Sequence, residues 1–439
     1  MKNALISFSF LFIVTLMDGQ NPIVPPGIYI ADPSAHQWKD GKMYIYGSRD
    51  ESPDYYCSWN HDVLSSEDLK TWTIFKNQFV SKGEGDQVPY SDDNLYAPDC
   101  QYANGNYYLY YCLANNTATE GVAISQLPTG PFMKGTNIRL AGYNEIDPCV
   151  FIDDDGQAYY IWGQFSAKMA KMKSNMTEID SSTIRTNVIT EKEHFFHEGG
   201  YMVKRNGIYY FVYAHMGRAG RPTCIGYATS TKPMGPFTYG GVIIDNDHCD
   251  PGCWNNHGSI AQFNGKWYVF YHRSTHGCNT MRKACVEPIS FNNDGSINEV
   301  EMSSQGAGSP FKADSETDAA KACLLYGNVR IINLPGDNEV LTGIKNGDVA
   351  AFKYLDFGSE PGTFNVKAIS GKKEVIIDVA LDNSWGPSIG SLVIPGDGDG
   401  KTVRSYSCGI KNVKGIHSLW FRFKGDYDDS FCMDSFLFD

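Results

Sequence analysis

The sequence has no apolar run long enough to cross a lipid bilayer. Its longest one, at residues 4–17, follows Lys2 and is too short for a span. Because no stop-transfer pattern comes after it, we interpret residues 1–19 as a cleaved secretory signal. The mature protein is therefore predicted to be exported, either secreted or periplasmic, and to have no membrane span.

Positive charge and cysteine are also scarce. The net charge is −13, and nucleic acids bind basic surfaces, so we expect no nucleic acid partner. Twelve cysteines in 439 residues are far fewer than a disulfide scaffold has. Cys249 and Cys253, which flank a Pro-Gly turn, form the pair that we expect to be bridged first. No Cys-x-x-Cys pair occurs, which disfavours a zinc site.

What the sequence does have is one hairpin pattern in five copies. Each copy has an Asx-Gly turn followed by a strand rich in Tyr or Trp, and the turn glycines are Gly41, Gly105, Gly156, Gly207 and Gly265. Such turns favour hairpins because both central residues accept positive φ. Hairpins repeated every 50 to 65 residues or so predict a propeller, with room for four strands in each unit. We therefore predict an all-β chain with a five-bladed β-propeller at residues 20–312.

A polar residue precedes the aromatic strand in every copy. These residues are Asp32, Asp99, Asp147, Glu198 and His257. Since the innermost strands of a propeller line one central channel, equivalent positions in the five blades would bring these side chains together. The alternative is five unrelated turn residues in an ordinary β-sandwich, and the shared spacing favours convergence.

Seven motifs in register resemble glycoside hydrolase family 43 over residues 22–312. They are Ala31-Asp32-Pro33, the Ser-x-Asp-Leu-x-x-Trp corner that ends at Trp72, Ala97-Pro98-Asp99, Ile146-Asp147-Pro148, His197-Glu198-Gly199, Asn256-His257-Gly258-Ser259 and Tyr271-His272-Arg273. The resemblance implies an inverting glycosidase that removes terminal α-L-arabinofuranosyl or β-D-xylosyl residues from plant cell-wall polysaccharide. Of the two sugars, arabinofuranose is slightly preferred.

The chemistry of the three carboxyl groups fits that activity. Hydrolysis of a glycosidic bond needs one carboxylic acid and one carboxylate, about 6.5–9.5 Å apart in inverting enzymes. Crowded carboxyl groups push their pKa values apart, which separates the two roles. The resemblance implies that Asp32 is the general base, Glu198 the general acid and Asp147 the group that orients the acid and raises its pKa. For Asp32 and Asp147 the alternative is an Asp-Pro turn that merely starts a strand.

The resemblance implies further roles around these groups. Arg273 would contact the substrate or the third carboxylate, and His257 would help to hold a calcium ion through water. The alternative for His257 is a hydrogen bond across the channel. Asp99 is a candidate substrate or structural contact. The candidate stacking platforms for sugar are Trp72, which would also pack beneath its corner, and Trp162.

The propeller pattern ends before residues 303–315, which are small and polar and read as a linker. Short alternating strands at residues 313–439 predict a β-sandwich of jelly-roll type. Gly347-Asp348, Leu381-Asp382 and His417–Trp420 are among the motifs that make it resemble carbohydrate-binding module family 6. The aromatic residue usual after Gly-Asp is missing, but Trp385 and Trp420 are candidate platforms. Sugar binding and a purely structural role both stay open for this domain.

Three other functions compete with the main interpretation. One is an endo-arabinanase or galactan-cleaving enzyme of the same family, although some galactan-cleaving members lack the base that Asp32 supplies here. Another is a non-catalytic sugar-binding propeller, which would not need a spaced acid and base. Retaining fructoside-cleaving propellers are a third, and their acid follows a motif different from His197-Glu198-Gly199.

Overall fold

The computed structural model describes residues 12–15, 20–114, 119–336, 338–358, 361–427 and 430–439. Most of the predicted secretory signal lies outside these residues. Its described part is strand β1 (Phe12–Thr15), which pairs antiparallel with β5 (Trp72–Val80). In the part of the chain that the structure describes, no helix is long and apolar enough to cross a membrane.

The first two thirds of the chain form five antiparallel sheets in sequence order. Short helical segments, α1 (Glu191–His194) and the 3₁₀ turn η1 (Ser181–Thr183), lie between them. The sheets are β2 (Ile30–Gln37), β3 (Met43–Arg49), β4 (Asn60–Ser66) and β5, with β1 at the edge; β6 (Leu95–Ala103), β7 (Asn106–Leu113), β8 (Glu120–Ser125) and β9 (Met133–Asn137); β10 (Cys149–Ile152), β11 (Ala158–Trp162) and β12 (Lys168–Lys171); β13 (Phe196–Arg205), β14 (Ile208–His215), β15 (Cys224–Ser230) and β16 (Thr238–Asp245); β17 (Ser259–Phe263), β18 (Lys266–Arg273) and β19 (Lys283–Ile289).

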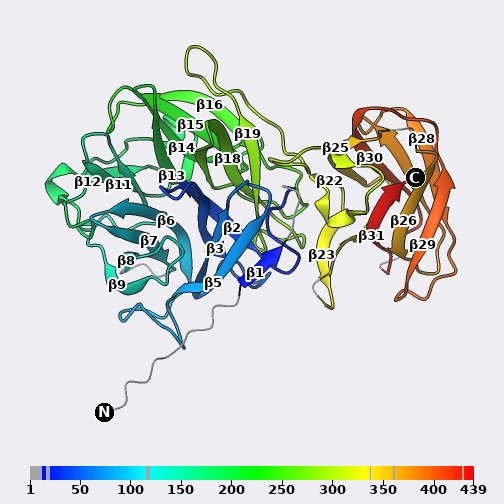
Figure 1. Cartoon of the computed structure of the whole chain (residues 1–439), viewed down its shortest axis with the longest axis horizontal. Helices are drawn as coiled ribbons and strands as arrows, with labels where there is room; N and C mark the ends of the chain where they lie inside the picture. Colours follow the sequence, from blue (N-terminus) through cyan, green and yellow to red (C-terminus); the bar gives the residue numbers. More distant parts are fainter. Residues whose placement is uncertain (1–11, 16–19, 115–118, 337, 359–360, 428–429) are drawn as a thin grey trace.

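The first strands of the five sheets form a closed ring. β2 contacts β6, β6 contacts β10, β10 contacts β13, β13 contacts β17, and β17 contacts β2 again. The predicted five-bladed propeller is therefore confirmed (Figure 1). The segment around Ile23 pairs with β19 of the last blade, since the Ile23 N–H donates to the Ala284 carbonyl at 2.9 Å. The Asn21 side chain pairs with both backbone groups of Val286.

The turns that predicted the blades form as expected. Between β6 and β7, Ala103 pairs with Asn106, so Asn104 and Gly105 make a two-residue loop. Both have positive φ, at 51° and 79°, which is the geometry that an Asn-Gly hairpin turn needs. The aromatic strands that follow the turns then bury their rings between neighbouring blades.

The last third of the chain forms a β-sandwich of two six-stranded sheets. Phe352 of one sheet meets Phe436 of the other with ring centroids 4.8 Å apart, so the sheets pack face to face. The 3₁₀ turn η2 (Ala319–Lys321) lies near its start. The first sheet is β20 (Phe311–Lys312), β22 (Leu324–Tyr326), β25 (Val349–Asp356), β27 (Val375–Leu381), β28 (Ser388–Ile394) and β30 (Ile416–Gly425); the second is β21 (Thr317–Asp318), β23 (Arg330–Leu334), β24 (Asn338–Thr342), β26 (Thr363–Ile369), β29 (Val403–Gly409) and β31 (Cys432–Phe438).

The structure contains no bridge between Cys249 and Cys253, so that expectation is wrong. All twelve cysteines are free. The Cys253 thiol instead hydrogen-bonds to Asn246, 3.2 Å from its side-chain oxygen. Both cysteines are buried and fill space as small apolar side chains.

Candidate active site

Irregular backbone at the inner strands turns side chains into the channel. The pairing register shifts between Ala31 and Ser34 in β2, and again between Glu198 and Tyr201 in β13. Left-handed φ values occur at the same level of four blades: Asp32 (52°), Ala97 (30°), Asp147 (61°) and Gly199 (65°). Because a bulge re-aims the side chains beside it, these strands direct polar groups toward one another.

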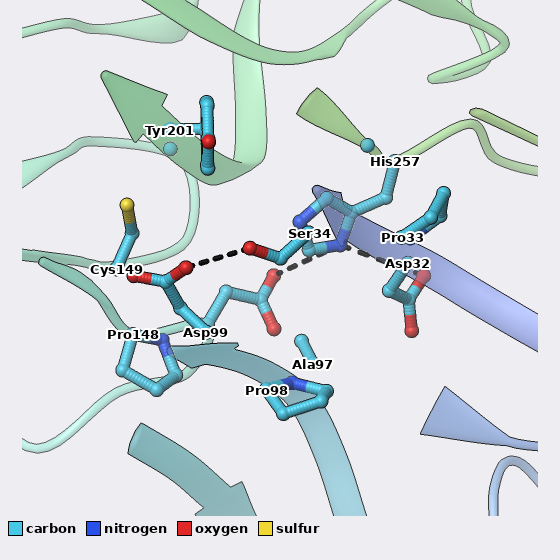
Figure 2. Close-up of a pocket in the computed structure, with 13 residues that line it drawn as sticks. Asp32, Pro33, Ser34, Ala97, Pro98, Asp99, Pro148, Cys149, Tyr201 and His257 are labelled. Atoms are coloured by element: carbon cyan, nitrogen blue, oxygen red, sulfur yellow. Dashed lines mark hydrogen bonds and ion pairs between the residues drawn. The ribbon is translucent and has the colours of Figure 1, made fainter. Parts of the chain in front are cut away.

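The position in the second blade that matches Asp32 and Asp147 is Ala97, and Asp99 lies deeper in the channel. Asp99 accepts hydrogen bonds from the Ser34 hydroxyl at 2.6 Å and the Val150 N–H at 2.8 Å. In Figure 2, Asp99 faces Ser34 on the side of the pocket away from Asp32. The volume of this pocket is only about 20 Å³. The Asp-Pro and Pro-Asp motifs therefore do not superimpose. Asp99 ties neighbouring blades together.

Asp32 is a buried carboxylate surrounded by donors. Its Oδ1 accepts from Arg282 Nη1 at 3.0 Å, and its Oδ2 accepts from the Ser48 hydroxyl at 2.7 Å. Its backbone N–H donates to Nδ1 of the neutral, buried His272. Burial opposes ionisation of Asp32, but the positive charge of Arg282 and the hydrogen bond from Ser48 favour it, and the pKa is lowered to about 2. Asp32 is therefore ionised at any ordinary pH.

Arg282 is a central residue of the site that the sequence did not reveal. It donates to both carboxylate oxygens of Asp50 at 2.9 Å, in addition to Asp32. Its guanidinium also lies over the Tyr56 ring, 5.0 Å from the centroid. Asp50 follows β3 and Arg282 precedes β19, and no motif links them. They meet because the ring closes between the first and last blades.

Asp147 has the opposite environment. It is 6% exposed, and the Cys112 thiol and His257 Nδ1 each lie 4.0 Å from one of its carboxyl oxygens. Burial raises its pKa well above the ordinary value, and the negative charges of Glu198 and Asp32 raise it further. Asp147 therefore tends to hold a proton where Asp32 cannot.

Glu198 lies at the start of β13, between polar side chains. Its Oε2 accepts a hydrogen bond from Gln164 at 2.8 Å, and Asn255 lies 3.5 Å from Oε1. His197 Nε2 is 3.8 Å from the same carboxyl group. The two neutral amides thus position the Glu198 carboxyl group in the pocket.

The three carboxyl groups line a single pocket of about 230 Å³. Each comes from a different blade. The predicted convergence of Asp32, Asp147 and Glu198 is thus seen in the geometry, together with that of His257. The pocket wall is completed by Tyr96 of β6, by His197 of β13 and by residues between strands: Tyr56, Cys57, Ile146, Gln164, Trp254, Asn255 and Arg282.

The family model of glycosyl hydrolases family 43 matches residues 20–297, more than half of the chain. The chain belongs to glycosyl hydrolases family 43. It is a glycosidase of the arabinofuranosidase or xylosidase type, and its family inverts the anomeric configuration. Residues 326–439 match the model of the family 6 carbohydrate binding module.

Relatives of known activity share this organisation. A xylosidase/arabinosidase of Thermoclostridium stercorarium is 29% identical over 92% of this chain and 96% of its own. An arabinoxylan arabinofuranohydrolase of Paenibacillus polymyxa is 28% identical over 88% of this chain and 69% of its own. The crystal structure of the family 43 arabinoxylan arabinofuranohydrolase from Bacillus subtilis, in complex with cellotetraose, is 26% identical with a TM-score of 0.57, covering 97% of this chain and 99% of that one.

A family 43 relative bears on the calcium expectation. The β-xylosidase/α-arabinofuranosidase from a compost metagenome, 30% identical with a TM-score of 0.54 over 66% of this chain and 99% of its own, is described in a calcium-free form. Calcium takes six to eight oxygen ligands. Within the described ranges no three His, Cys, Asp or Glu side chains are grouped to hold a metal, and Nδ1 of His257 faces Asp32 at 3.5 Å. A calcium ion held by His257 through water would not need such a group, so that role stays a prediction.

Three candidate contacts of this family 43 enzyme lie away from the pocket. Trp72 and Trp162 are each 1% exposed and pack in the cores of their blades, with their N–H groups bonded to backbone carbonyls. Arg273 is 3% exposed, and its Nε donates to the Cys285 sulfur. The exposed indole at the pocket is that of Trp254, at 46%. It sits in a loop, where strand periodicity gives no signal.

Proposed function

We propose that this protein is an exported glycosidase that removes terminal α-L-arabinofuranosyl or β-D-xylosyl residues from plant cell-wall polysaccharide. Asp32 is its general base, Glu198 its general acid and Asp147 the modulator of the acid. The observation that carries the proposal is that these three carboxyl groups line one pocket, in which the pKa of Asp32 is lowered and that of Asp147 is raised. A protein that only bound sugar would have no use for that difference.

The proposed mechanism gives each group one role. Asp32 is held ionised by Arg282, so it takes a proton from a water molecule as the water oxygen bonds to the anomeric carbon. Asp147 and Glu198 repel each other when both are ionised, so the pair retains a proton. Glu198 gives that proton to the leaving oxygen as the glycosidic bond breaks. One inverted sugar results, and the proton taken by Asp32 balances the one lost by Glu198.

The surroundings of the pocket suit one small sugar ring. Trp254 offers an exposed apolar face at the pocket, and stacking on such faces is a common way to hold sugars. Gln164 and Asn255 hold the acid in place from the side of the leaving group. The family 6 module and the polysaccharide-degrading relatives support a polymeric substrate. Export follows from the predicted secretory signal and would bring the enzyme to that polymer.

The test compares wild type with Glu198→Gln on two kinds of substrate. One is the pair of 4-nitrophenyl glycosides of α-L-arabinofuranose and β-D-xylose, and the other is soluble arabinoxylan. We expect Glu198→Gln to lose about 10²–10⁴-fold in pentose release from arabinoxylan. The loss on the nitrophenyl glycosides should be smaller, because nitrophenolate leaves with less help from an acid.

Glu193→Gln is the matched control, since Glu193 is exposed on α1 only five residues upstream. It should keep wild-type rates on every substrate. Equal losses on both substrate kinds would argue against an acid role for Glu198. Release of a sugar with retained configuration, followed by NMR at early times, would argue against Asp32 as a base toward water.

A further inference from the structure

A groove separates the propeller from the sandwich on one side of the molecule. Its volume is about 620 Å³, within the 300–1,000 Å³ or so of typical ligand sites. Strand β22 of the sandwich borders it and faces the propeller (Figure 1). The propeller contributes Arg218, Asp245, Asp247, His248 and residues 299–302, and the sandwich contributes Leu324, Tyr326 and Lys353.

An aromatic platform stands in this groove. The Tyr326 ring is 37% exposed and lies 4.4 Å from the His248 ring, with 30° between their planes. Behind it, Trp420 is nearly parallel to Tyr326 with centroids 6.5 Å apart. The Leu325 N–H donates to the His248 carbonyl at 2.6 Å, which joins the two domains at this point. Two neighbouring rings therefore hold Tyr326 in place, while 37% of the residue stays exposed at the groove.

The charges of the groove are paired within it. Arg218 donates to both carboxylate oxygens of Glu299 at 2.6 Å, and Lys353 pairs with Glu301. Asp245 and Asp247 add two further carboxylates. Carboxylates outnumber the cations, so the groove does not attract a polyanion. Carboxylate oxygens with remaining lone pairs do suit the hydroxyl groups of a neutral sugar.

We propose that this groove binds a neutral polysaccharide chain, with Tyr326 as the stacking platform and the paired carboxylates as hydroxyl acceptors. The site would hold the polymer while the propeller pocket works on its side groups or ends. The inference rests on the proposed function for the choice of polymer. It also gives the sandwich a binding role at its edge strand β22, on the side that faces the propeller.

The test measures binding of soluble arabinoxylan by calorimetry, in a Glu198→Gln background so that nothing is hydrolysed. Tyr326→Ala should weaken binding by about tenfold. His248→Asn removes the supporting ring but keeps a residue that tolerates the φ of 67° found there, and it should weaken binding less. Tyr102→Ala is the control, because Tyr102 has the same 37% exposure on β6.

Four outcomes separate this proposal from its rivals. Unchanged binding in Tyr326→Ala and His248→Asn overturns it, as does equally tight binding of the acidic polymer polygalacturonate. With Glu198 intact, Tyr326→Ala should hydrolyse nitrophenyl pentosides at the wild-type rate. If wild type hydrolyses neither pentoside while arabinoxylan binding still depends on Tyr326, the result supports the binding groove and contradicts the proposed activity.

Discussion

At the scale of single residues, three chemically similar carboxyl groups differ because their neighbours differ. Asp32 has a guanidinium and a hydroxyl on its oxygens, whereas Asp147 has a thiol and an imidazole no closer than 4.0 Å. The first environment favours the charged form and the second disfavours it. Sequence motifs identify which carboxyl groups matter, but their ionisation depends on side chains such as Arg282 that approach from another blade.

The raised pKa of Asp147 predicts a pH-dependent cost in stability. In the unfolded chain its pKa has the ordinary value near 3.8, and in the native state it is higher. Its contribution to stability is therefore fully present below the unfolded pKa and is lost as pH rises through the native one. Asp147→Asn, which is never charged, should raise the melting temperature by about 2 °C or more at pH 7. This gain should shrink toward about pH 4.

Thermal unfolding of wild type and Asp147→Asn across that pH range checks this prediction. Asp155→Asn is the control, because Asp155 is exposed in the turn of the same hairpin. Its melting temperature should follow wild type at every pH. A stability difference for Asp147→Asn that is the same at pH 4 and pH 7 would show that packing, and not ionisation, causes it.

How much could be predicted at this scale depended on where each residue lies. Asp32, Asp147 and Glu198 belong to motifs at strand starts. The sequence repeat therefore predicted that they meet, and they line one pocket. Trp72 begins β5 and Trp162 ends β11, and the alternation of side chains along a strand does not say which face meets the next blade. Both are buried there. Loop residues such as Trp254 carry no periodic signal, and only the folded ring brings them to the pocket.

At the scale of elements, hairpin turns were predictable and inner-strand bulges were not. An Asn-Gly turn has a local cause in backbone conformation, so it can be seen in the sequence. The bulge at Gly199 depends on what lies across the channel. A Cβ atom added there would come within 2.5 Å of the His257 ring. The absence of a side chain at Gly199 thus lets His257 lie beside Asp32 and Asp147.

Gly199→Ala should therefore damage the site through His257. We expect at least a tenfold loss in kcat/KM on nitrophenyl pentosides and a loss of about 1–3 kcal/mol in the free energy of unfolding. Gly207→Ala is the matched control in the same hairpin: its φ of 78° is equally strained, but nothing lies within 4 Å of the added Cβ. It should lose about 1 kcal/mol and keep its activity. Equal activities of the two variants would contradict a positioning role for Gly199.

At the scale of the whole molecule, the sequence predicts two all-β units but not how they join. Residues 303–315 read as a linker, yet Ser304 and Gln305 donate backbone hydrogen bonds to Lys353 of the sandwich. The Tyr29 hydroxyl at the start of the propeller donates to Asn333 at 2.5 Å. The contact of Tyr29 with Asn333 joins residues 304 positions apart, and no local pattern encodes such contacts. The propeller and the sandwich thus share a polar, buried interface.

The centre of that interface is the ion pair between Lys283 and Glu339, with 2% and 5% of the side chains exposed. Lys283→Met leaves the Glu339 carboxylate buried without its cation, so it should cost about 3–5 kcal/mol in urea unfolding. Lys283→Met with Glu339→Leu should recover most of this loss, because no charge is then buried. Lys367→Met is the control: it breaks an exposed pair with Glu316 and should cost about 1 kcal/mol or less. If Lys283→Met lowers the free energy of unfolding no more than Lys367→Met does, the interface between the two domains does not depend on this ion pair.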